Sequence, residues 1–534
     1  KNNVHLTWYD DRDDPGKNIE IYYKRSSEIT ECTIPTDSMS ITENTTFCPG
    51  VYELPNGLSI GADNITLDCN GATLIGGVFG ASGVLNNGNN VTIANCNITN
   101  YFNGIFMSQK NYNYIMNNTL TGNNNAGLYL ESSSYNTIAL NKISAAGSGI
   151  LLYFNANNNT LVSNTVDNNN EGILIWEFSN YNVLINNTAN NNSFSGIDIV
   201  TSSYNNLTKN MMNNNKFNFL ILGDLYHELF FEQTLDTSNL VDGKPIYYVK
   251  DASNAIFDSL TNAGTFYCIR CNNITIRDLT LNNNGAAVTF IRTTDSTIEK
   301  INASSNLRGI RVAFSSNNNL LSNNIANDNV VEGIRLVSSN YNNLSYNKVY
   351  NNRFGTSAGI YISHSSLNNT ITQNTLINNL IGIRLQVSSS FNKIFNNFLN
   401  NTVNASDDSF NFWNTTKDCS QRNIIDGLCI GGNFWHNYNG TDLDGDGIGD
   451  TYLPYNSDGE IVNGGDFLPL VKWKVLGDVT GDGKVDIFDL ASVGKAFGSQ
   501  PGDSNWNGNA DTNGDGVVNI LDLATVGKNF GSGS

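Results

Sequence analysis

The sequence predicts an all-β solenoid, a right-handed parallel β-helix, followed by a small C-terminal α-helical calcium-binding domain. Three observations predict this fold class. Asparagine supplies 94 of the 534 residues and glycine 48, and both are poor helix formers, which excludes a helix bundle. Asparagines and alternating apolar residues recur about every 23 positions, as they do in stacked repeats. Two acidic loops with EF-hand spacing lie near the end of the chain.

The first segment, residues 1–27, has the pattern of one β-hairpin. The runs 4–12 and 19–26 resemble one hairpin of a sialidase-like propeller blade. A single hairpin cannot bury its own apolar face. Either a propeller has been removed upstream, or this hairpin packs on its own solenoid or on another copy.

The second segment, residues 28–413, carries the repeat. Two asparagine series keep the 23-residue spacing independently: Asn118, Asn141, Asn164, Asn187 and Asn210, and Asn113, Asn136, Asn159, Asn182 and Asn205. Glycines followed by alternating apolar residues mark the strands: Gly104, Gly127, Gly149, Gly172, Gly196, Gly309, Gly333, Gly359 and Gly382. Alternation with a period of two predicts short strands with one buried face.

We expect each coil to pair with the next about 4.8 Å along a common axis. Asparagine suits this stacking because it tolerates the left-handed backbone of tight turns, and because its amide can donate to one coil while accepting from the other. The alternative is a disordered asparagine-rich tract. The apolar positions keep their phase with the asparagines, which favours the solenoid. Residues 222–265 break the period and are expected to form a side excursion between two runs of coils.

The solenoid segment also resembles a known family. The runs 48–52, 64–71, 241–248 and 431–435 are similar to β-helix proteins grouped with the periplasmic copper-protein accessory factor of nitrous oxide reductase, a branch of the carbohydrate-binding and sugar-hydrolase solenoids. The resemblance covers residues 28–470 and implies the fold. It does not imply one function, because such folds serve lyases, hydrolases, epimerases and non-enzymes.

The charge and hydropathy of the chain limit its partners. A net charge of −19 and a pI near 4.5 disfavour nucleic acid and favour calcium or basic surfaces. No apolar run approaches the roughly 20 residues of a membrane span. The chain opens with Lys1-Asn2-Asn3 and without a signal peptide, so we expect a processed, extracellular or cell-surface protein. Sequons such as Asn64-Ile-Thr permit surface glycans.

The eight cysteines fall into pairs that are close in the sequence: Cys32 and Cys48, Cys69 and Cys96, Cys268 and Cys271, and Cys419 and Cys429. In an acidic, asparagine-rich chain these pairs predict disulfides formed in an oxidising compartment. The Cys268-Ile-Arg-Cys271 run is also compatible with a redox or metal site. No second CxxC or histidine pair lies near it, which favours the disulfide.

The third segment, residues 414–474, is predicted to cap the solenoid and contains an acidic loop. Four carboxylates and one backbone carbonyl could converge on a calcium ion: Asp442, Asp444, Asp446 and Asp450, with the carbonyl of Ile448. The alternative is a polar loop that Trp435 and Tyr438 hold against the end of the solenoid.

The last segment, residues 475–534, repeats a loop-and-helix unit with a spacing of 33 residues, and it resembles a type I dockerin. The resemblance implies calcium ligands in both loops: Asp478, Thr480, Asp482, Asp486 and Asp489, and Asp511, Asn513, Asp515, Asn519 and Asp522. The carbonyls of Lys484 and Val517 would complete the two shells. Thr480 is a weaker ligand than the usual Asp or Asn. The alternative is a pair of solvated acidic turns.

A dockerin binds a cohesin through loop positions 10 and 11 and the helix faces. Those positions hold Ile487, Phe488, Ile520 and Leu521 here. Cellulosomal dockerins often carry Ser or Thr at one of them, so these apolar pairs indicate an adhesive patch for a different partner, either a cohesin-like domain or another copy of the chain.

No catalytic site is evident in the sequence. No outward strand column stacks acidic residues, and the four histidines are scattered, which gives copper little support. Two outward columns are candidates for glycan binding: Tyr153 with Trp176, and Arg311 with Arg335 and Arg384. The aromatic column could instead pack under a neighbouring segment, and the arginines could pair with carboxylates such as Glu332.

Taken together, the patterns predict a secreted, non-catalytic structural protein, a disulfide-pinned and calcium-capped rod whose ends join other subunits. A rod with adhesive ends suits head-to-tail contacts that propagate into a filament or sheath. The rival hypothesis is a polysaccharide-binding or polysaccharide-degrading component that the dockerin-like tail carries into a larger complex.

Overall fold

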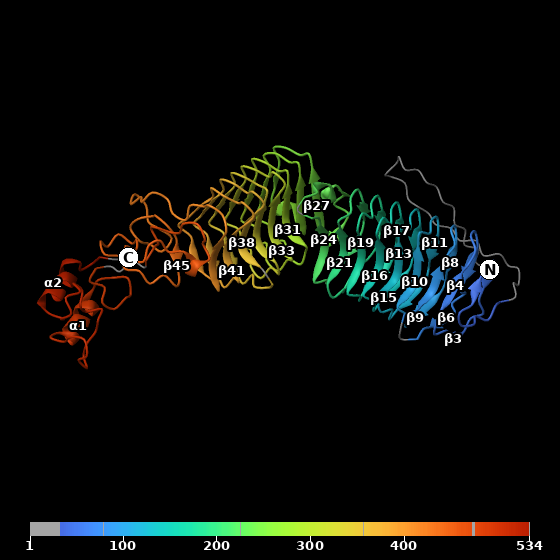
Figure 1. The fold of residues 1–534 in the computed structure, drawn as a ribbon, viewed down its shortest axis with the longest axis horizontal. Coiled ribbons are helices and arrows are strands. Elements are labelled where there is room, and N and C mark those ends of the chain that lie inside the picture. Colours follow the sequence, from blue (N-terminus) through green and yellow to red (C-terminus); the bar gives the residue numbers. More distant parts are fainter. Residues whose placement is uncertain (1–31, 78–79, 225, 356, 472–475, 533–534) are drawn as a thin grey trace.

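The computed structural model describes residues 32–77, 80–224, 226–355, 357–471 and 476–532. Two runs of right-handed parallel coils form a rod that bends near β24 and β27, and two short helices end the chain (Figure 1). The predicted fold class is therefore confirmed. The hairpin predicted over residues 1–27 lies outside the described residues.

Three parallel sheets form the first run. The first sheet has the order β1 (Ser40–Ile41), β4 (Leu58–Ile60), β7 (Ser82–Asn86), β10 (Asn103–Ser108), β13 (Ala126–Glu131), β16 (Ser148–Tyr153), β19 (Glu171–Trp176), β21 (Ser195–Val200) and β24 (Phe217–Leu222). The second has the order β2 (Thr45–Thr46), β5 (Thr66–Asp68), β8 (Thr92–Ala94), β11 (Tyr114–Met116), β14 (Thr137–Ala139), β17 (Thr160–Val162), β20 (Val183–Ile185), β22 (Asn206–Thr208) and β25 (Thr234–Leu235). The third has the order β18 (Thr165–Val166), β15 (Lys142–Ser144), β12 (Thr119–Thr121), β9 (Asn97–Thr99), β6 (Thr73–Ile75) and β3 (Val51–Glu53).

The second run repeats this arrangement. Its first sheet has the order β23 (Met211–Met212), β26 (Leu240–Val241), β27 (Lys244–Lys250), β29 (Thr265–Ile269), β31 (Ala286–Ile291), β33 (Arg308–Ala313), β35 (Glu332–Val337), β38 (Ala358–Ser363), β41 (Ile381–Leu385) and β44 (Val403–Asp407). Its second has the order β28 (Ile256–Phe257), β30 (Thr275–Arg277), β32 (Thr297–Glu299), β34 (Leu320–Ser322), β36 (Asn343–Ser345), β39 (Thr370–Thr372) and β42 (Lys393–Phe395). Its third has the order β37 (Lys348–Tyr350), β40 (Thr375–Ile377), β43 (Phe398–Asn400) and β45 (Phe434–Trp435).

Helical segments lie outside the stacked strands. They are the 3-10 turns η1 (Glu228–Phe231), η2 (Ser259–Thr261) and η3 (Ser457–Gly459), and the α-helices α1 (Ile487–Ala496) and α2 (Ile520–Lys528).

The apolar core runs along the axis of the rod because equivalent residues of successive coils pair in register. Ile150 pairs with Leu128 of the preceding coil and with Ile173 of the following coil, and all three are fully buried. The predicted glycine-led strands therefore place alternate side chains inside the rod. Each coil buries its apolar residues against its neighbours, so no coil has an independent core.

Buried asparagine side chains join the coils in continuous ladders. Asn164 illustrates the pattern: its Oδ1 accepts hydrogen bonds from both the backbone N–H and the Nδ2 of Asn141 (3.0 Å each). Its own Nδ2 donates to Oδ1 of Asn187 (2.9 Å) and to the carbonyl oxygen of Ile138 (2.9 Å). Both predicted asparagine series form such ladders, which confirms that the coils stack along one axis.

The left-handed turns, however, are not made by the ladder asparagines. The residue just before each of them has the positive φ, as at Asn117, Leu140, Ser163, Asn186 and Lys209. Such a conformation costs a non-glycine residue about 1–2 kcal/mol. The turn directs the next side chain into the rod, where its four hydrogen bonds hold the strained backbone.

The irregular segment 222–265 forms the junction between the two runs. After β24, residues 226–233, here named the strap, lie across the outer face of the second run. Within the strap, Phe231 is 1% exposed and its ring lies 6.1 Å from that of Phe314. β25 then extends the second sheet of the first run, while β26 pairs in parallel with β23 and antiparallel with β27, so these strands connect the two runs.

We predict that Asn164→Ala lowers the free energy of unfolding by at least about 3 kcal/mol. The substitution leaves several buried backbone and amide groups without partners, and each such group costs about 1–3 kcal/mol. Urea-induced unfolding of the full chain measures the effect. Asn206→Ala is the control, because Asn206 is exposed on β22. Equal loss for both variants would contradict the structural importance of the ladder.

Candidate functional site

The C-terminal module is built from two loops that each begin a helix. In the first loop, Asp489 accepts hydrogen bonds from the N–H groups of Val479 and Thr480 (2.8 Å each) and from that of Asp486 (2.8 Å). These bonds lower the pKa of Asp489, although burial opposes them. Asp489 also completes a capping box with Asp486 at the start of α1. The loop therefore holds the Asp489 carboxylate in place and caps the start of α1.

The second loop repeats this geometry. Asp522 accepts from the N–H groups of Thr512 (2.7 Å) and Asn519 (2.8 Å), and Asn519 caps α2 in the same way. Gly483 and Gly516 occupy equivalent positions with φ of 86° and 83°, a conformation that glycine adopts without strain. The chemistry of the donor set, carboxylate and amide oxygens around a tight turn, fits calcium.

The four predicted docking residues lie on the surface of this module. Ile487 and Phe488 are 60% and 65% exposed at the start of α1, and Ile520 and Leu521 are 62% and 57% exposed at the start of α2. We name these four residues the docking pairs. They are apolar but contribute little to the core of the module, which consists of residues such as Val493 and Val526.

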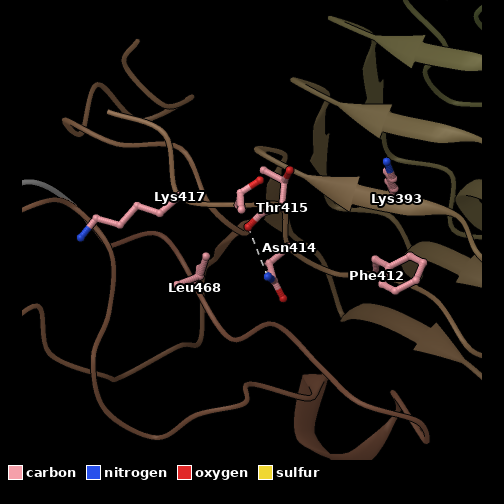
Figure 2. Close-up of a pocket in the computed structure, with 7 residues that line it drawn as sticks. Lys393, Phe412, Asn414, Thr415, Lys417 and Leu468 are labelled. Atoms are coloured by element: carbon pink, nitrogen blue, oxygen red, sulfur yellow. Dashed lines mark hydrogen bonds between the residues drawn. The ribbon is translucent and has the colours of Figure 1, made fainter. Parts of the chain in front are cut away.

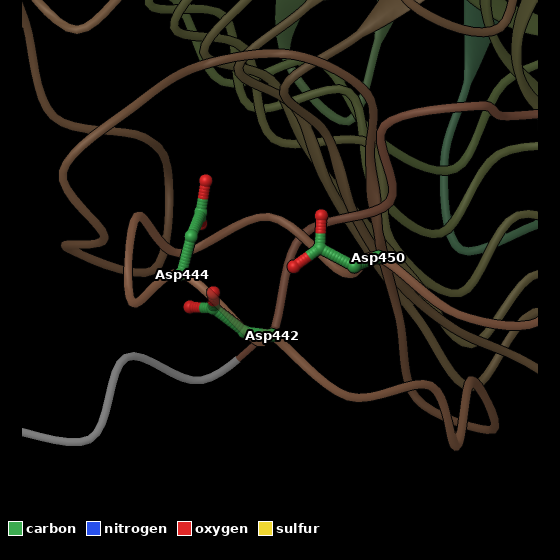
Figure 3. A group of neighbouring side chains, drawn as sticks. All are labelled: Asp442, Asp444 and Asp450. Carbon is green, nitrogen blue, oxygen red and sulfur yellow. The ribbon is translucent and has the colours of Figure 1, made fainter.

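The acidic loop of the cap has a similar backbone. Asp442 accepts from the N–H groups of Gly445 (2.7 Å) and Gly447 (2.8 Å), as Asp478 does from Gly481 (2.7 Å) and Gly483 (2.8 Å). Potential ligand atoms of Asp442, Asp444 and Asp450 lie within 4.8 Å of one another (Figure 3).

The predicted fourth carboxylate of this loop does not join the group. Asp446 forms an ion pair with Lys417, whose Nζ also lies 3.6 Å from a carboxylate oxygen of Asp444. Lys417 comes from another part of the cap, which the loop sequence alone could not indicate. An ammonium group thus balances part of the negative charge of the loop.

A shallow cavity of about 460 Å³ lies beside this cap. Figure 2 shows Lys393 and Lys417 at opposite ends of it, and the other lining residues are Phe412, Asn414, Thr415, Thr416 and Leu468. None of these lining residues is acidic, and the two lysines do not converge. The cavity has no arrangement suited to acid–base catalysis.

The predicted aromatic column is present on the outer face of the first run. The ring of Tyr153 lies 5.1 Å from that of Trp176 and 6.3 Å from that of Tyr129. Trp176 is 39% exposed. The neighbouring Leu151 and Leu174 are nearly buried and pack with Tyr129 and Tyr153.

The predicted arginine column divides into two parts. Arg311 and Arg335 are neighbours on β33 and β35, whereas Arg384 lies beyond Tyr361, whose ring contacts Arg335 on one side (4.8 Å) and Arg384 on the other (5.3 Å). Arg311 is only 5% exposed, with the ring of Phe231 in the strap 5.0 Å from its guanidinium carbon.

The arginines belong to a larger polar group at the bend, the crease cluster. It consists of Asp198, Tyr267, Arg308, Arg311, Glu332 and Arg335. The two runs meet there: the N–H of Gly285 donates to the carbonyl oxygen of Phe219 (2.9 Å), and a Cβ on Gly285 would overlap Leu220. As expected for paired arginines, Glu332 binds Arg335 (2.6 Å) and Arg308 (3.1 Å).

Sequence analysis missed Asp198. Its backbone pairs with those of Leu174 and Leu220 in an outward column, and an acidic residue in that apolar column was the available signal. Burial raises the pKa of Asp198 to about 8, although the hydroxyl of Ser195 donates a hydrogen bond (2.8 Å) that favours the carboxylate. Asp198 is therefore mostly protonated at neutral pH.

The structure contains the four predicted disulfides, which join Cys32 to Cys48, Cys69 to Cys96, Cys268 to Cys271, and Cys419 to Cys429. The Cys268–Cys271 pair is buried and oxidised, so its thiols are not available as metal ligands. In the described part of the chain, no helix is long and apolar enough to cross a membrane.

A family model described as periplasmic copper-binding protein (NosD) matches residues 146–244 and 232–440, which together exceed half of the chain. The chain belongs to the NosD family. A model of the right-handed β-helix region matches residues 21–189 of this NosD-family chain, and a dockerin type I model matches residues 476–531. No curated protein matches the chain.

Two solved structures are similar to this NosD-family chain at low identity. The A-module of the Azotobacter vinelandii mannuronan C-5 epimerase AlgE4 is 12% identical, with 69% of this chain and 88% of that chain covered and a TM-score of 0.27. PfbA, a surface adhesin of Streptococcus pneumoniae, is 12% identical, with 68% and 85% covered and a TM-score of 0.30. At these scores the similarities carry no argument about function.

We predict that Asp198→Asn makes the stability of the chain less dependent on pH. The folded-state pKa of about 8 exceeds that of an exposed Asp, about 3.9. Between these values the folded state binds the extra proton, so the free energy of unfolding of the wild type falls as pH rises.

Asn mimics the neutral acid, so the difference in Tm, variant minus wild type, is expected to grow from pH 5 to pH 9. Thermal unfolding at a series of pH values measures it. Glu53→Gln, on the exposed strand β3, provides the control. A difference that does not change with pH would contradict a raised pKa at Asp198.

Proposed function

We propose that the chain is a secreted, non-catalytic structural or adhesive protein, a calcium-stabilised β-helix rod that joins other subunits through its dockerin-type module. The observation that carries this proposal is the exposure of the docking pairs at equivalent positions of two loop-and-helix units. Exposed apolar residues on a rigid scaffold are typical of binding surfaces. The disulfides support an extracellular or cell-surface location.

In this proposal the two tail loops hold calcium through the ligands named above, together with the carbonyls of Lys484 and Val517. Calcium would offset the mutual repulsion of the loop carboxylates and fix the helix starts. The cap loop would hold a third ion through Asp442, Asp444 and Asp450, with the carbonyl of Ile448. Asp446 would join only after releasing Lys417.

Copper, which the family description mentions, has less support from the residues of this chain. Copper prefers imidazole and sulfur ligands. Among the described residues, the one group of three or more His, Cys, Asp or Glu side chains placed to share an ion is the acidic group of the cap. His227, His364 and His436 have different neighbours.

The partner in this proposal is a cohesin-like domain or a second copy of the chain. Contact between a tail and a different surface of the next rod would be heterologous, and such contacts extend into filaments when their rotation does not close. The net charge of −19 opposes close packing of bare rods. Calcium is therefore expected to promote association by neutralising acidic loops as well as by ordering the module.

We predict that Lys417→Met strengthens calcium binding at the cap loop at least several-fold. The substitution removes the ammonium group that competes with a cation for Asp444 and Asp446. Calorimetric titration of the full chain measures the affinity, with Lys393→Met as the matched control from the opposite end of the cavity. Unchanged affinity in the Lys417 variant, or absence of binding at this loop, would contradict a cap calcium site.

We predict that Phe488→Ser combined with Leu521→Ser abolishes calcium-dependent association. Light scattering and electron micrographs of the native chain, with calcium and with EGTA, measure self-assembly, and binding to an immobilised cohesin domain tests the other partner. Phe530→Ser is the control, because Phe530 is 53% exposed and lies outside both the docking pairs and the calcium loops. Monomers with calcium that also bind no cohesin would contradict the proposal.

A polysaccharide-binding function is the second candidate, and the partly exposed Tyr153–Trp176 pair favours it because aromatic rings can stack on sugars. A polysaccharide-binding function predicts a different result for the native chain and for the variant with substituted docking pairs. Co-sedimentation with an insoluble polysaccharide would survive the substitutions in the docking pairs and be lost in Trp176→Ala.

A further inference from the structure

The crease cluster carries more positive charge than its neighbours balance. Both carboxylate oxygens of Glu332 are occupied, one by Arg335 and one by Arg308. Arg311, which pairs with Arg335 on the next coil, has no carboxylate partner in the described part of the chain. Three guanidinium groups therefore share one carboxylate, although the chain as a whole is strongly acidic.

Asp198 does not supply the missing negative charge. In addition to burial, the charge of Asp198 raises the pKa of Tyr267 and the charge of Arg311 lowers it, so the three side chains lie near one another. Its raised pKa keeps it mostly neutral at pH 7, and its Oδ1 has no hydrogen-bond partner. The positive charge of Arg311 is therefore not balanced by Asp198, and a buried charge that is neither paired nor hydrogen-bonded is costly.

The unpaired atoms of Arg311 are arranged to bind an anion. Its Nε and Nη2 are both buried without hydrogen-bond partners. These two N–H groups lie on one edge of the planar guanidinium, and such an edge binds two oxygens of a carboxylate, phosphate or sulfate. The ring of Phe231 in the strap covers the guanidinium face, which leaves the edge as the direction of approach.

The surroundings limit the size of the ligand. Arg311 is 5% exposed and the side chain of Arg335 11%, whereas that of Arg308 is 21% exposed and lies nearest to solvent. This burial favours a small ligand over a polymer. A water molecule could satisfy one or two N–H groups, but it would not balance the charge of neighbouring guanidinium groups on successive coils.

We propose that the crease cluster binds a small oxyanion, either a carboxylate or a tetrahedral anion of the sulfate or phosphate type, on the Nε–Nη2 edge of Arg311. The anion bridges Arg311 and its charged neighbours at the bend. It stabilises the junction between the two runs of coils. The site is independent of the calcium loops and of the docking pairs.

The test uses the full chain, dialysed into chloride buffer with calcium. Sodium sulfate and sodium acetate are titrated separately at constant ionic strength, and calorimetry and Tm are recorded. The wild type is expected to show saturable binding of one anion per chain and a rise in Tm, because a ligand that binds only the folded state stabilises it. The anion that binds with the higher affinity identifies the ligand class.

Arg311→Met removes the binding edge and is expected to weaken binding at least tenfold. Arg384→Met is the matched control, because Arg384 occupies the same column beyond Tyr361 and its loss should leave binding unchanged. If the Arg311 variant does not fold, Arg308→Gln, at the more exposed edge of the cluster, is expected to weaken binding severalfold instead.

A tightly held anion would escape a titration of the wild type. Ion chromatography of the protein after exhaustive dialysis and acid denaturation therefore measures any retained sulfate, phosphate or organic acid. About one retained anion per chain, lost in Arg311→Met, supports the proposal. If the wild type shows neither a retained anion nor saturable binding, the proposal is overturned. Equal binding by the Arg311→Met variant and the wild type also overturns it.

Discussion

The hydrogen bonds between asparagine side chains of successive coils are the interaction on which the rest of the molecule depends. The primary amide carries two donors and an acceptor on a short side chain, so one residue can bond to the coils on both sides. Asn164 uses all of this capacity. A slip of one residue between successive coils would leave several buried polar groups unpaired, and this fixes the register of the stack. This explains why a chain with few charged residues still forms a regular rod.

One asparagine ladder of each run ends by closing on a nearby residue. In the first run, Asn215 bonds to Asn218, three residues further on, instead of to the next coil. In the second run, the backbone N–H of Asn401 bonds to Asn404 in the same way. At the first of these points the strap crosses to the second run, and the crease cluster forms between the two.

The aspartates of the acidic loops stabilise the turns of their own backbone. Asp442 and Asp478 accept hydrogen bonds from backbone N–H groups of their own turns with closely matching distances. Each loop thus holds its carboxylates in place through its own backbone. The cap loop also has a neighbouring cation from outside the loop, because Lys417 forms ion pairs with Asp444 and Asp446.

The sequence by itself determined the elements whose partners recur at a fixed spacing. The period of 23 residues predicted the strands, the ladders and their register, and the local spacing of oxygen donors predicted the backbone of the acidic loops. Only the tertiary structure decided which residues meet across the bend. Asp198 and Arg311 lie on different runs, and Lys417 reaches Asp446 from another part of the cap. No repeat relates these pairs, because their proximity depends on how the rod turns and on where the strap lies. The sequence analysis assigned the left-handed turns to the repeating asparagines, but the residue before each ladder asparagine adopts that conformation, since the asparagine itself must point inward to bond along the axis.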